Sequence, residues 1–371
     1  MKKILFFHFD LQGGGAEKVL VNLLNHLDST KYDITLRVLF GVGTNLKLLP
    51  ANVHFQPVFK KMFRGLPTIL KLFSGKFLYR LFVRDKYDIE IAYLETLPTR
   101  IIAYSTNTES KKLAWVHTTM NENYRFPPSF RSADEATNCY NKFDSIQFVS
   151  QGALEAFNCY LPKVNTSKSV IYNVNDYDMV KKLAEEHVEN GMINSKNFNI
   201  CAVGRLIKLK GYDRLIKAFA RVKQEKKDID TELFIIGQGE EQNSLEELIA
   251  DEGLSQSVHL LGFKSNPYKY MAKMDLFVCS SIIEGYSTVV TEAISLGVPV
   301  LTTNCSGMEE ILHDGKYGMI VDNDDKSLYQ GLKKITDSQD LLIKYREAIS
   351  KDSTYNTQAF VERYEQLFDE L

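Results

Sequence analysis

Two glutamates, Glu284 and Glu292, have a spacing that allows both to bind one ligand. Gly285 predicts a turn after Glu284, and the apolar pattern predicts a helix over 289–296 that contains Glu292. Carboxylates accept paired hydrogen bonds from vicinal hydroxyl groups, such as those of a sugar or a ribose. Amide groups at the start of this helix, up to Thr288, would stabilise a phosphate. The alternative is two surface glutamates on an ordinary helix, which the spacing alone favours because glutamate is a common helix residue.

A cationic loop, 204–211, follows the first expected strand in the second half of the chain. Arg205 can form paired hydrogen bonds with phosphate oxygens, and Lys210 can add a point charge. Parallel sheets bind ligands at the carboxyl ends of their strands, which is where this loop is expected. The loop therefore predicts a diphosphate site, with a solvated basic loop as the alternative.

Three glycines, Gly13, Gly14 and Gly15, directly follow the first expected strand of the chain. Glycines permit a close backbone approach to a ligand, and the start of the next helix offers N–H groups to an anion. The NAD fingerprint does not fit, because Lys18 stands where its third glycine is needed. His117 ends another expected strand, where its imidazole could hydrogen-bond a substrate hydroxyl. The alternatives are a structural glycine turn and a structural histidine.

The sequence gives little indication of a metal site or of disulfide bonds. Asp228 and Asp230 lie in a charged stretch that is typical of a solvated turn, and 322–325 indicates a helix N-cap. The cysteines are scattered, without a Cys-x-x-Cys pair, which predicts reduced thiols in a cytosolic protein. No histidine or glutamate cluster has the spacing of metal ligands, so no metal is expected.

The segment 59–86 mixes cations with apolar residues and contains a single acid, Asp85. A basic amphipathic segment can lie on an anionic bilayer. The alternative, weighed equally, is a pair of helices with one packed face and one solvated basic face. The cations are Lys60, Lys61, Arg64, Lys71, Lys76, Arg80, Arg84 and Lys86, interleaved with Phe63, Leu66, Ile69, Leu70, Leu72, Phe73, Phe77, Leu78, Leu81 and Phe82.

The fold that positions these residues is predicted by the hydrophobic pattern, in which strands and helices alternate along the chain. Short apolar runs separated by helices indicate parallel βαβ units, and the pattern restarts near residue 199. We therefore expect an α/β fold with two doubly wound, Rossmann-like domains, 1–172 and 173–353, and an amphipathic C-terminal helix over 354–371. The expected strands are 4–9, 34–40, 89–94, 113–117, 146–150, 199–203, 232–236, 258–261, 276–280, 300–302 and 319–321. The other expected helices are 17–27, 177–191, 212–223, 243–252, 266–273 and 289–296.

Composition narrows the class of protein further. The 371 residues favour two domains, and the formal net charge of −2 gives no attraction to nucleic acid. No stretch reaches the roughly 18 apolar residues of a membrane span, and the first apolar run is too short for a signal peptide. The sequence therefore predicts a cytoplasmic protein that is soluble, or peripheral on the inner face of the cell membrane.

Three motifs, in this order and at this spacing, resemble glycosyltransferase family 4, whose members have the GT-B fold and retain the anomeric configuration of the donor. The resemblance covers nearly the whole chain. It implies two domains that face each other across a cleft, and a C-terminal helix, 354–371, that packs back on the first domain. Where the family commonly has Phe-Pro or Leu-Pro after Glu-Gly, this chain has Tyr286-Ser287. The motifs are Gly13-Gly-Gly-Ala-Glu17, Val203-Gly-Arg-Leu-Ile-Lys-Leu-Lys-Gly211 and Ser280-Ser-Ile-Ile-Glu-Gly-Tyr-Ser-Thr-Val-Val-Thr-Glu-Ala293, followed by Gly297-Val-Pro-Val300.

The resemblance implies a role for each candidate residue. Glu284 and His117 are the expected catalytic residues: Glu284 would bind hydroxyls of the donor sugar, and His117 would lie near its C6 side. Glu292 would bind the ribose. The donor diphosphate would contact Arg205, Lys210, Gly14 and Gly15, the donor sugar would contact Glu284, Gly285, Tyr286, Ser287 and Thr288, and the nucleobase would contact Phe263, Lys264 and Tyr268.

By the same resemblance, we expect a hexosyltransferase of surface polysaccharide synthesis. Its donor would be a UDP-hexose or a UDP-N-acetylhexosamine, and its acceptor a glycan or an undecaprenyl-diphosphate-linked sugar. The nucleotide sugar would be a co-substrate, with no cofactor, no metal and no nucleic acid involved. The alternatives are a GT-B UDP-sugar epimerase or hydrolase and a non-catalytic GT-B-like binding protein, and the altered glycine motif disfavours a dehydrogenase.

Overall fold

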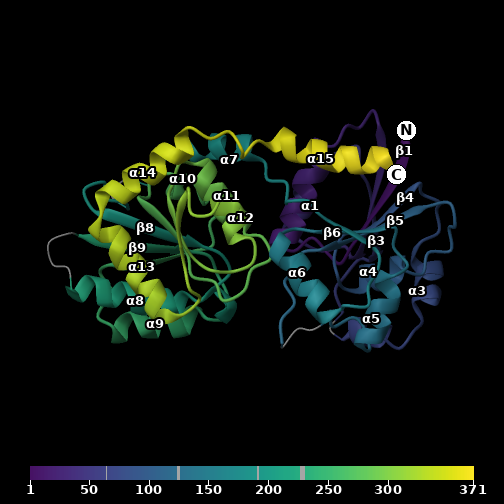
Figure 1. The fold of residues 1–371 in the computed structure, drawn as a ribbon, viewed down its shortest axis with the longest axis horizontal. Helices are drawn as coiled ribbons and strands as arrows, with labels where there is room; N and C mark the ends of the chain where they lie inside the picture. The colour runs from purple at the N-terminus through teal and green to yellow at the C-terminus, as the bar shows by residue number, and fades with distance from the viewer. Residues whose placement is uncertain (64, 123–125, 190–191, 226–229) are drawn as a thin grey trace. The chain divides into compact units, whose positions relative to one another are not determined.

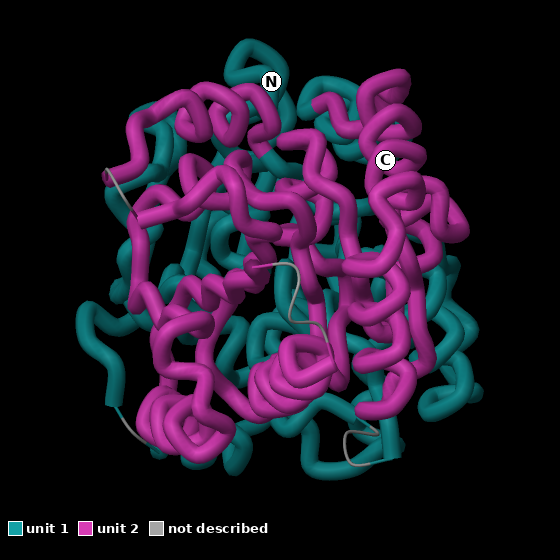
Figure 2. The backbone as a smooth tube through the Cα atoms, turned by 90° about the vertical axis from the view of Figure 1, so that its left-hand side faces the viewer, with its two compact units in different colours: residues 1–175, 357–371 teal, residues 176–356 magenta. Residues whose placement is uncertain are grey.

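The computed structural model describes residues 1–63, 65–122, 126–189, 192–225 and 230–371. The chain divides into two compact units, coloured separately in Figure 2. Unit 1 comprises residues 1–175 and 357–371, and unit 2 comprises residues 176–356. Each unit has one parallel sheet with helices on both faces (Figure 1), which confirms the predicted α/β class.

Unit 1 is built on a seven-stranded sheet with the order β3-β2-β1-β4-β5-β6-β7, and all its strand pairs are parallel. The order reverses between β1 and β4, and loops at the carboxyl ends of strands beside such a switch point form ligand sites. The strands are β1 (Lys2–His8), β2 (Tyr32–Phe40), β3 (His54–Phe59), β4 (Ile89–Ala92), β5 (Lys111–Val116), β6 (Ser145–Phe148) and β7 (Ser167–Val170).

Two helices that are far apart in sequence, α1 (Gly15–His26) and α15 (Thr357–Glu370), cover one face of this sheet (Figure 1). Tyr364 of α15 stacks on Trp115 with ring centroids 5.1 Å apart, and Phe368 meets Phe6 edge-on at 6.2 Å. These contacts explain why α15 belongs to unit 1. The helices that follow α1 in this unit are η1 (Thr44–Leu48), α2 (Leu66–Leu70), α3 (Gly75–Phe82), α4 (Leu97–Ile102), α5 (Ala133–Tyr140) and α6 (Gln151–Tyr160).

Two strands of this sheet, β3 and β7, were not expected from the sequence. Both lie at the edges of the sheet and neither contains a fully buried residue. An edge strand buries little apolar surface, so its sequence lacks the apolar run that marks a central parallel strand.

The segment 59–86 forms the end of β3, the short helices α2 and α3, and the turns between them. It has the packed face expected of a helix pair, because Leu70, Leu78 and Phe82 lie in the core of unit 1. Ser74 caps α3 by accepting the backbone N–H of Phe77. The outer face is apolar as well as basic, and Arg64, one of its expected cations, lies outside the described residues.

Unit 2 has a six-stranded parallel sheet with the order β10-β9-β8-β11-β12-β13. Helices α8, α9 and α13 pack on one face through an apolar core, and α7, α10, α11 and α12 lie on the other (Figure 1). The strands are β8 (Phe198–Val203), β9 (Thr231–Ile236), β10 (Val258–Gly262), β11 (Leu276–Cys279), β12 (Val300–Thr303) and β13 (Gly318–Val321). The helices are α7 (Tyr177–Ala184), η2 (Lys208–Lys210), α8 (Tyr212–Glu225), α9 (Gln242–Asp251), α10 (Tyr268–Met271), α11 (Thr288–Ser295), α12 (Met308–Leu312), α13 (Asp325–Asp337) and α14 (Gln339–Ser350).

Two further sequence predictions concern segments that could have mattered for localisation and metal binding. No helix in the described part of the chain is long and apolar enough to cross a membrane. Asp324 is an N-cap, as predicted, because its carboxylate accepts the backbone N–H of Ser327 at the start of α13. Asp228, from the other acidic segment, lies outside the described residues.

Candidate active site

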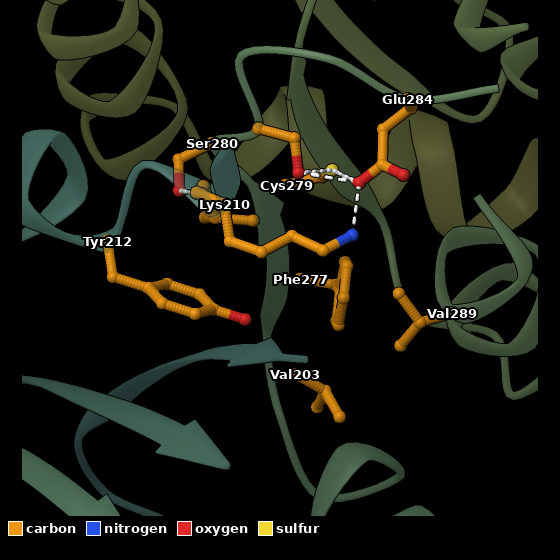
Figure 3. Close-up of a pocket in the computed structure, with 10 residues that line it drawn as sticks. Val203, Lys210, Tyr212, Phe277, Cys279, Ser280, Glu284 and Val289 are labelled. Atoms are coloured by element: carbon orange, nitrogen blue, oxygen red, sulfur yellow. Dashed lines mark hydrogen bonds and ion pairs between the residues drawn. The ribbon is translucent and has the colours of Figure 1, made fainter. Parts of the chain in front are cut away.

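A pocket lies at the carboxyl edge of the unit 2 sheet, between the loops that follow the neighbouring strands β8 and β11 (Figure 3). The first loop carries Lys210 and the second carries Glu284, so the strand order brings together two residues that are far apart in sequence. The pocket is lined by Val203, Lys210, Tyr212, Phe277, Val278, Cys279, Ser280, Ser281, Glu284 and Val289.

An ion pair between Lys210 and Glu284 occupies the polar side of this pocket. The Lys210 Nζ atom lies 2.6 Å from Glu284 Oε1, and the two side chains are 23% and 12% exposed (Figure 3). The hydroxyl of Ser281 also donates to Glu284 Oε1, at 2.6 Å. Charge-assisted hydrogen bonds of this length are strong, so the carboxylate has a defined position at the pocket.

The environment of the pair keeps Lys210 charged. Burial opposes the charge, but the Glu284 carboxylate outweighs it, and the pKa of the Lys210 ammonium is raised. The buried Cys279 thiol beside them has a raised pKa, because burial and the Glu284 charge both disfavour a thiolate. The pocket therefore presents a cation and a carboxylate, with an uncharged thiol next to them.

Backbone contacts hold the two loops against each other. The Ser280 hydroxyl donates to the Lys210 carbonyl oxygen at 2.9 Å, and the Ile282 N–H donates to the Leu209 carbonyl oxygen at 2.8 Å. Gly211, which ends the short helix before α8, has a φ of +61°, and a Cβ atom there would lie 2.3 Å from the Ser280 carbonyl oxygen. Only glycine satisfies both the left-handed conformation and this close approach.

Glu292 lies on α11 and is almost fully buried. Its Oε1 atom accepts a hydrogen bond from the hydroxyl of Tyr268 at 3.2 Å. Glu292 is not among the residues that line the pocket around Glu284. Glu292, the predicted ribose residue, is thus hydrogen-bonded to Tyr268, a predicted nucleobase residue. Glu284, the predicted sugar residue, is instead paired with Lys210, a predicted diphosphate residue.

The remaining predicted residues of unit 2 lie in the loops that follow β8 and β10 and in the loop that precedes α11. Arg205 is exposed in the loop after β8, and Phe263, after β10, is 64% exposed. Lys264 lies over the ring of Tyr270, with its ammonium 5.6 Å from the centroid. Gly285, Tyr286 and Ser287 lead into α11, which begins at Thr288, so their amides precede a helix as expected, and Tyr286 and Ser287 are buried.

In unit 1, the predicted residues Gly14, Gly15 and His117 follow β1 and β5 at the carboxyl edge of the sheet. Gly14 is the N-cap of α1, and Gly15 is the first residue of that helix. His117 packs on Tyr93, with ring centroids 4.8 Å apart, and Tyr93 also contacts His8 at 6.3 Å. Tyr93 therefore connects the end of β1 with the end of β5.

His117 is an uncharged imidazole near neutral pH. Burial, with a further contribution from the positive charge of His8, lowers the pKa of His117 to about 3. Burial likewise lowers the pKa of His8 to about 4, against the opposing hydrogen bond to the Asp10 carbonyl. His117 can therefore give or accept a hydrogen bond from a substrate hydroxyl, but it is not a cationic acid.

A buried carboxylate that the sequence analysis did not single out, Glu95, holds the backbone beside His117. Glu95 accepts the backbone N–H of His117 at 3.0 Å and the hydroxyl of Thr118. Burial raises the pKa of Glu95. Its position directly after β4, beside the switch point of the sheet, was the available sequence signal.

The described residues contain no group of three or more histidine, cysteine, aspartate or glutamate side chains arranged to hold a metal ion. The charges that face the pocket of unit 2 are those of Lys210 and Glu284.

Two units, each with one parallel sheet and helices on both of its faces, define the class of protein by its fold, which is the GT-B fold. One solved structure with this fold is that of HepE from Anabaena in complex with UDP. It is similar to this chain with a TM-score of 0.76 and 20% identity, and the match covers 100% of both chains. The GT-B fold predicted from the motifs is therefore confirmed.

Sequence comparison gives the family. Residues 184–354 match the family described as glycosyl transferases group 1. The N-acetylgalactosamine-N,N'-diacetylbacillosaminyl-diphospho-undecaprenol 4-alpha-N-acetylgalactosaminyltransferase of Campylobacter jejuni is 30% identical over 354 residues, which are 93% of each chain. The capsular polysaccharide biosynthesis glycosyltransferase CapM of Staphylococcus aureus is 33% identical over 149 residues, 39% of this chain and 38% of CapM. The chain belongs to the group 1 glycosyltransferases, and it is a transferase.

Proposed function

We propose that the protein is a retaining glycosyltransferase that takes a hexose or an N-acetylhexosamine from a UDP-sugar. The observation that carries this proposal is the Lys210–Glu284 pair at the carboxyl ends of β8 and β11. A nucleotide sugar needs a cation for its diphosphate and an acceptor of hydrogen bonds for its sugar hydroxyls, and one pocket offers both. The UDP in the HepE structure favours uridine as the nucleoside.

The proposed reaction uses electrostatic stabilisation and needs no enzymic nucleophile. Lys210, helped by Arg205, stabilises the negative charge that develops on the leaving diphosphate. The acceptor hydroxyl oxygen bonds to the anomeric carbon on the face from which the diphosphate departs, and the carbon–oxygen bond to the phosphate breaks. The departing phosphate oxygen takes the proton of the hydroxyl. Glu284 holds the sugar hydroxyls, and neutral His117 hydrogen-bonds the sugar on its C6 side.

We further propose that the acceptor is a glycan or a sugar linked to undecaprenyl diphosphate, in the synthesis of a surface polysaccharide. The name of the Campylobacter relative contains such a lipid-linked acceptor, and the Staphylococcus relative is a capsule enzyme. The protein would then work on the cytoplasmic face of the membrane. The basic segment 59–86 would face the anionic lipid that carries the acceptor.

A thermal-shift panel of UDP-, GDP- and ADP-sugars tests the donor. A ligand that binds the folded protein raises its melting temperature by mass action. We expect the largest increase with a UDP-sugar, and a larger increase with a GDP-sugar would contradict the assignment. Addition of EDTA should leave the rate of transfer unchanged, because cationic side chains supply the charge compensation in this proposal.

Substitutions test the pair itself. Glu284→Ala should lower the rate of transfer about a hundredfold or more, because the contact with the sugar hydroxyls is lost. UDP should still bind, because Lys210, although it loses its ion pair with Glu284, remains available to the diphosphate. Lys210→Ala should weaken UDP binding roughly tenfold, because a diphosphate contact is lost. Lys333→Ala and Glu225→Ala are matched controls, since these residues form a lysine–glutamate pair on the surface of unit 2. Normal transfer by Glu284→Ala would remove this residue from the site.

A further inference from the structure

Exposed apolar side chains gather in one short segment of unit 1. Of the fourteen large hydrophobic residues that are exposed in the described chain, seven lie between residues 62 and 81. Solvent-exposed hydrophobic residues are ordinarily scattered, and a cluster marks an interaction site. The seven residues, which we call the apolar tip, are Met62, Phe63, Ile69, Leu72, Phe73, Phe77 and Leu81.

The apolar tip is fixed in its outward orientation by the core beneath it. Leu70, Leu78 and Phe82, which alternate with the exposed residues, are buried in the core of unit 1. Leu72 is 77% exposed, and the ring of Phe73 stacks on that of Phe77 with centroids 5.4 Å apart. The exposed side chains therefore cannot turn inward without displacing the buried ones.

Two arginines bind the backbone carbonyls of the turn that carries Leu72 and Phe73. Arg100, which is 1% exposed, donates to the carbonyl oxygens of Leu70 at 3.3 Å, Lys71 at 3.3 Å and Phe73 at 2.8 Å. Arg131 donates to the Lys71 carbonyl at 2.8 Å and 2.5 Å and to the Phe73 carbonyl at 3.2 Å.

Glu135 contacts the side chain of Arg100 and the backbone of Arg131. It accepts a hydrogen bond from Arg100 Nε at 2.9 Å and from the backbone N–H of Arg131 at 2.6 Å. The carbonyls of Leu70, Lys71 and Phe73 thus have partners inside the protein. Backbone groups that enter a bilayer need such internal partners.

Charge identifies the partner of this surface. Six described cations of the segment 59–86, which also contains the apolar tip, are exposed, and Asp85 is the acid of this segment. A second copy of the chain would bring like charges together at the same face, whereas anionic lipid headgroups complement them. The exposed cations are Lys60, Lys61, Lys76, Arg80, Arg84 and Lys86.

We propose that the apolar tip is a preformed wedge that enters the boundary between headgroups and acyl chains of an anionic bilayer. Arg100 and Arg131 supply the hydrogen bonds that the carbonyls of Leu70, Lys71 and Phe73 would otherwise take from water, and the six cations contact the headgroups. This deepens the proposed lipid-linked acceptor, because it replaces simple electrostatic attraction with insertion of named side chains.

Cosedimentation with vesicles tests the wedge. The double variant Leu72→Ser/Phe73→Ser should bind vesicles of phosphatidylglycerol and phosphatidylethanolamine at least about tenfold more weakly than the parent protein. Ile343→Ser, which removes an exposed apolar side chain of α14 in unit 2, should bind as the parent protein does. Equal binding by the double variant would overturn the proposal. A mass that doubles with concentration in the parent protein and not in the double variant would also overturn it, in favour of a dimer.

Insertion has a second, spectroscopic readout. In Phe73→Trp, brominated acyl chains should quench the new tryptophan, and part of the binding should persist in about 0.5 M salt, where surface attraction is screened. Ile343→Trp should show no quenching. Absence of quenching in Phe73→Trp, or complete release by salt, would reduce the contact to surface adsorption and overturn insertion. UDP binding by the double variant, measured by calorimetry, separates failure of the wedge from failure of the proposed donor site.

Discussion

Ser281 is a residue whose importance follows from its contacts. Its hydroxyl donates to Glu284, and its carbonyl accepts from the Thr303 hydroxyl at 2.6 Å and from the Cys305 thiol at 3.1 Å. The residue is therefore fixed from the neighbouring strand β12 and in turn orients the carboxylate. Lys210 holds the same oxygen of Glu284, so the two donors divide the task of positioning it.

We predict that Ser281→Ala lowers the rate of transfer roughly tenfold and leaves UDP affinity unchanged, because one hydrogen bond to a charged group is lost. Steady-state kinetics and calorimetry measure the two quantities. Ser244→Ala, on the exposed surface of α9, is the control. A loss of UDP affinity as large as the loss of rate would show that Ser281 supports the fold of the pocket and does not position Glu284.

His8 and His117 predict that the protein loses stability in mild acid. Their pKa values, about 4 and about 3 in the folded protein, lie below the ordinary value of 6.5. Between the folded pKa values and 6.5, the unfolded chain therefore binds more protons than the folded protein does. As a result, the free energy of unfolding falls as the pH drops below about 6.5. The expected slope is at most about 1.4 kcal/mol per pH unit for each imidazole.

Urea unfolding at several pH values measures this slope. His117→Gln should unfold with a smaller dependence on pH than the parent protein, because one buried imidazole no longer titrates. His54→Gln is the control, since the His54 side chain is 65% exposed. An unchanged slope in His117→Gln would contradict the burial of this imidazole.

The sequence singled out the candidate residues but did not predict the contacts between them. The motifs placed Lys210 and Glu284 after strands, and the carboxyl edge of a parallel sheet is where such residues meet. The direct pairing of the two depends on β8 and β11 being neighbours, which is a property of the strand order. The same holds for Tyr268 and Glu292, and for Glu95, whose contacts with His117 and Thr118 join loops after β4 and β5.

At the scale of the element, the loop before α8 requires a glycine at position 211. Gly211 and Gly253 both have a positive φ, +61° and +68°. A Cβ at Gly211 would collide with the Ser280 carbonyl, whereas a Cβ at Gly253 would meet nothing within 4 Å. Substitution of Gly253 by alanine therefore tests backbone strain alone, whereas substitution of Gly211 tests the same strain together with a steric clash.

We predict that Gly253→Ala costs about 1 kcal/mol of stability through its backbone conformation alone. Gly211→Ala should cost about 3 kcal/mol, because the backbone strain is joined by displacement of the Ser280 loop. It should also weaken UDP binding, because Lys210 moves with this loop. Urea unfolding and calorimetry check both quantities, and equal costs for the two variants would contradict the contact with Ser280.

Secondary structure was predictable where burial was complete. Every expected strand lies on an observed one, with ends that shift by one or two residues. The missed strands, β3 and β7, are edge strands whose residues are half-exposed or exposed. Hydrophobic pattern reports burial, so it reports an edge strand weakly. The outward direction of Leu72 and Phe73 was likewise invisible in sequence, because the neighbouring apolar residues of the same segment are buried.

At the scale of the whole molecule, α15 ties the end of the described chain to unit 1. Phe368 is fully buried and packs against Phe6 and Tyr32, with ring centroids 6.2 Å and 5.9 Å apart. The single tryptophan of the chain, Trp115, stacks on Tyr364 of the same helix. Tryptophan fluorescence therefore reports on unit 1 and not on unit 2.

We predict that Phe368→Ala lowers the stability of unit 1 by about 3–5 kcal/mol, because a buried aromatic ring is replaced by a cavity. Tryptophan emission should shift at a lower temperature than in the parent protein, while binding of UDP to unit 2 persists. Gln366→Ala, on the exposed side of α15, is the control. Simultaneous loss of UDP binding at the lower temperature would show that the two units unfold together.

The placement of α15 in unit 1 also limits when the core of unit 1 can form during translation. β1 is synthesised before unit 2, whereas α15, which packs on the same sheet, is synthesised after it. During that interval the nascent chain presents the rings of Phe6, Tyr93 and Trp115 without the helix that covers them. Unit 1 therefore cannot complete its core until unit 2 has been synthesised, and the rings left uncovered until then favour aggregation.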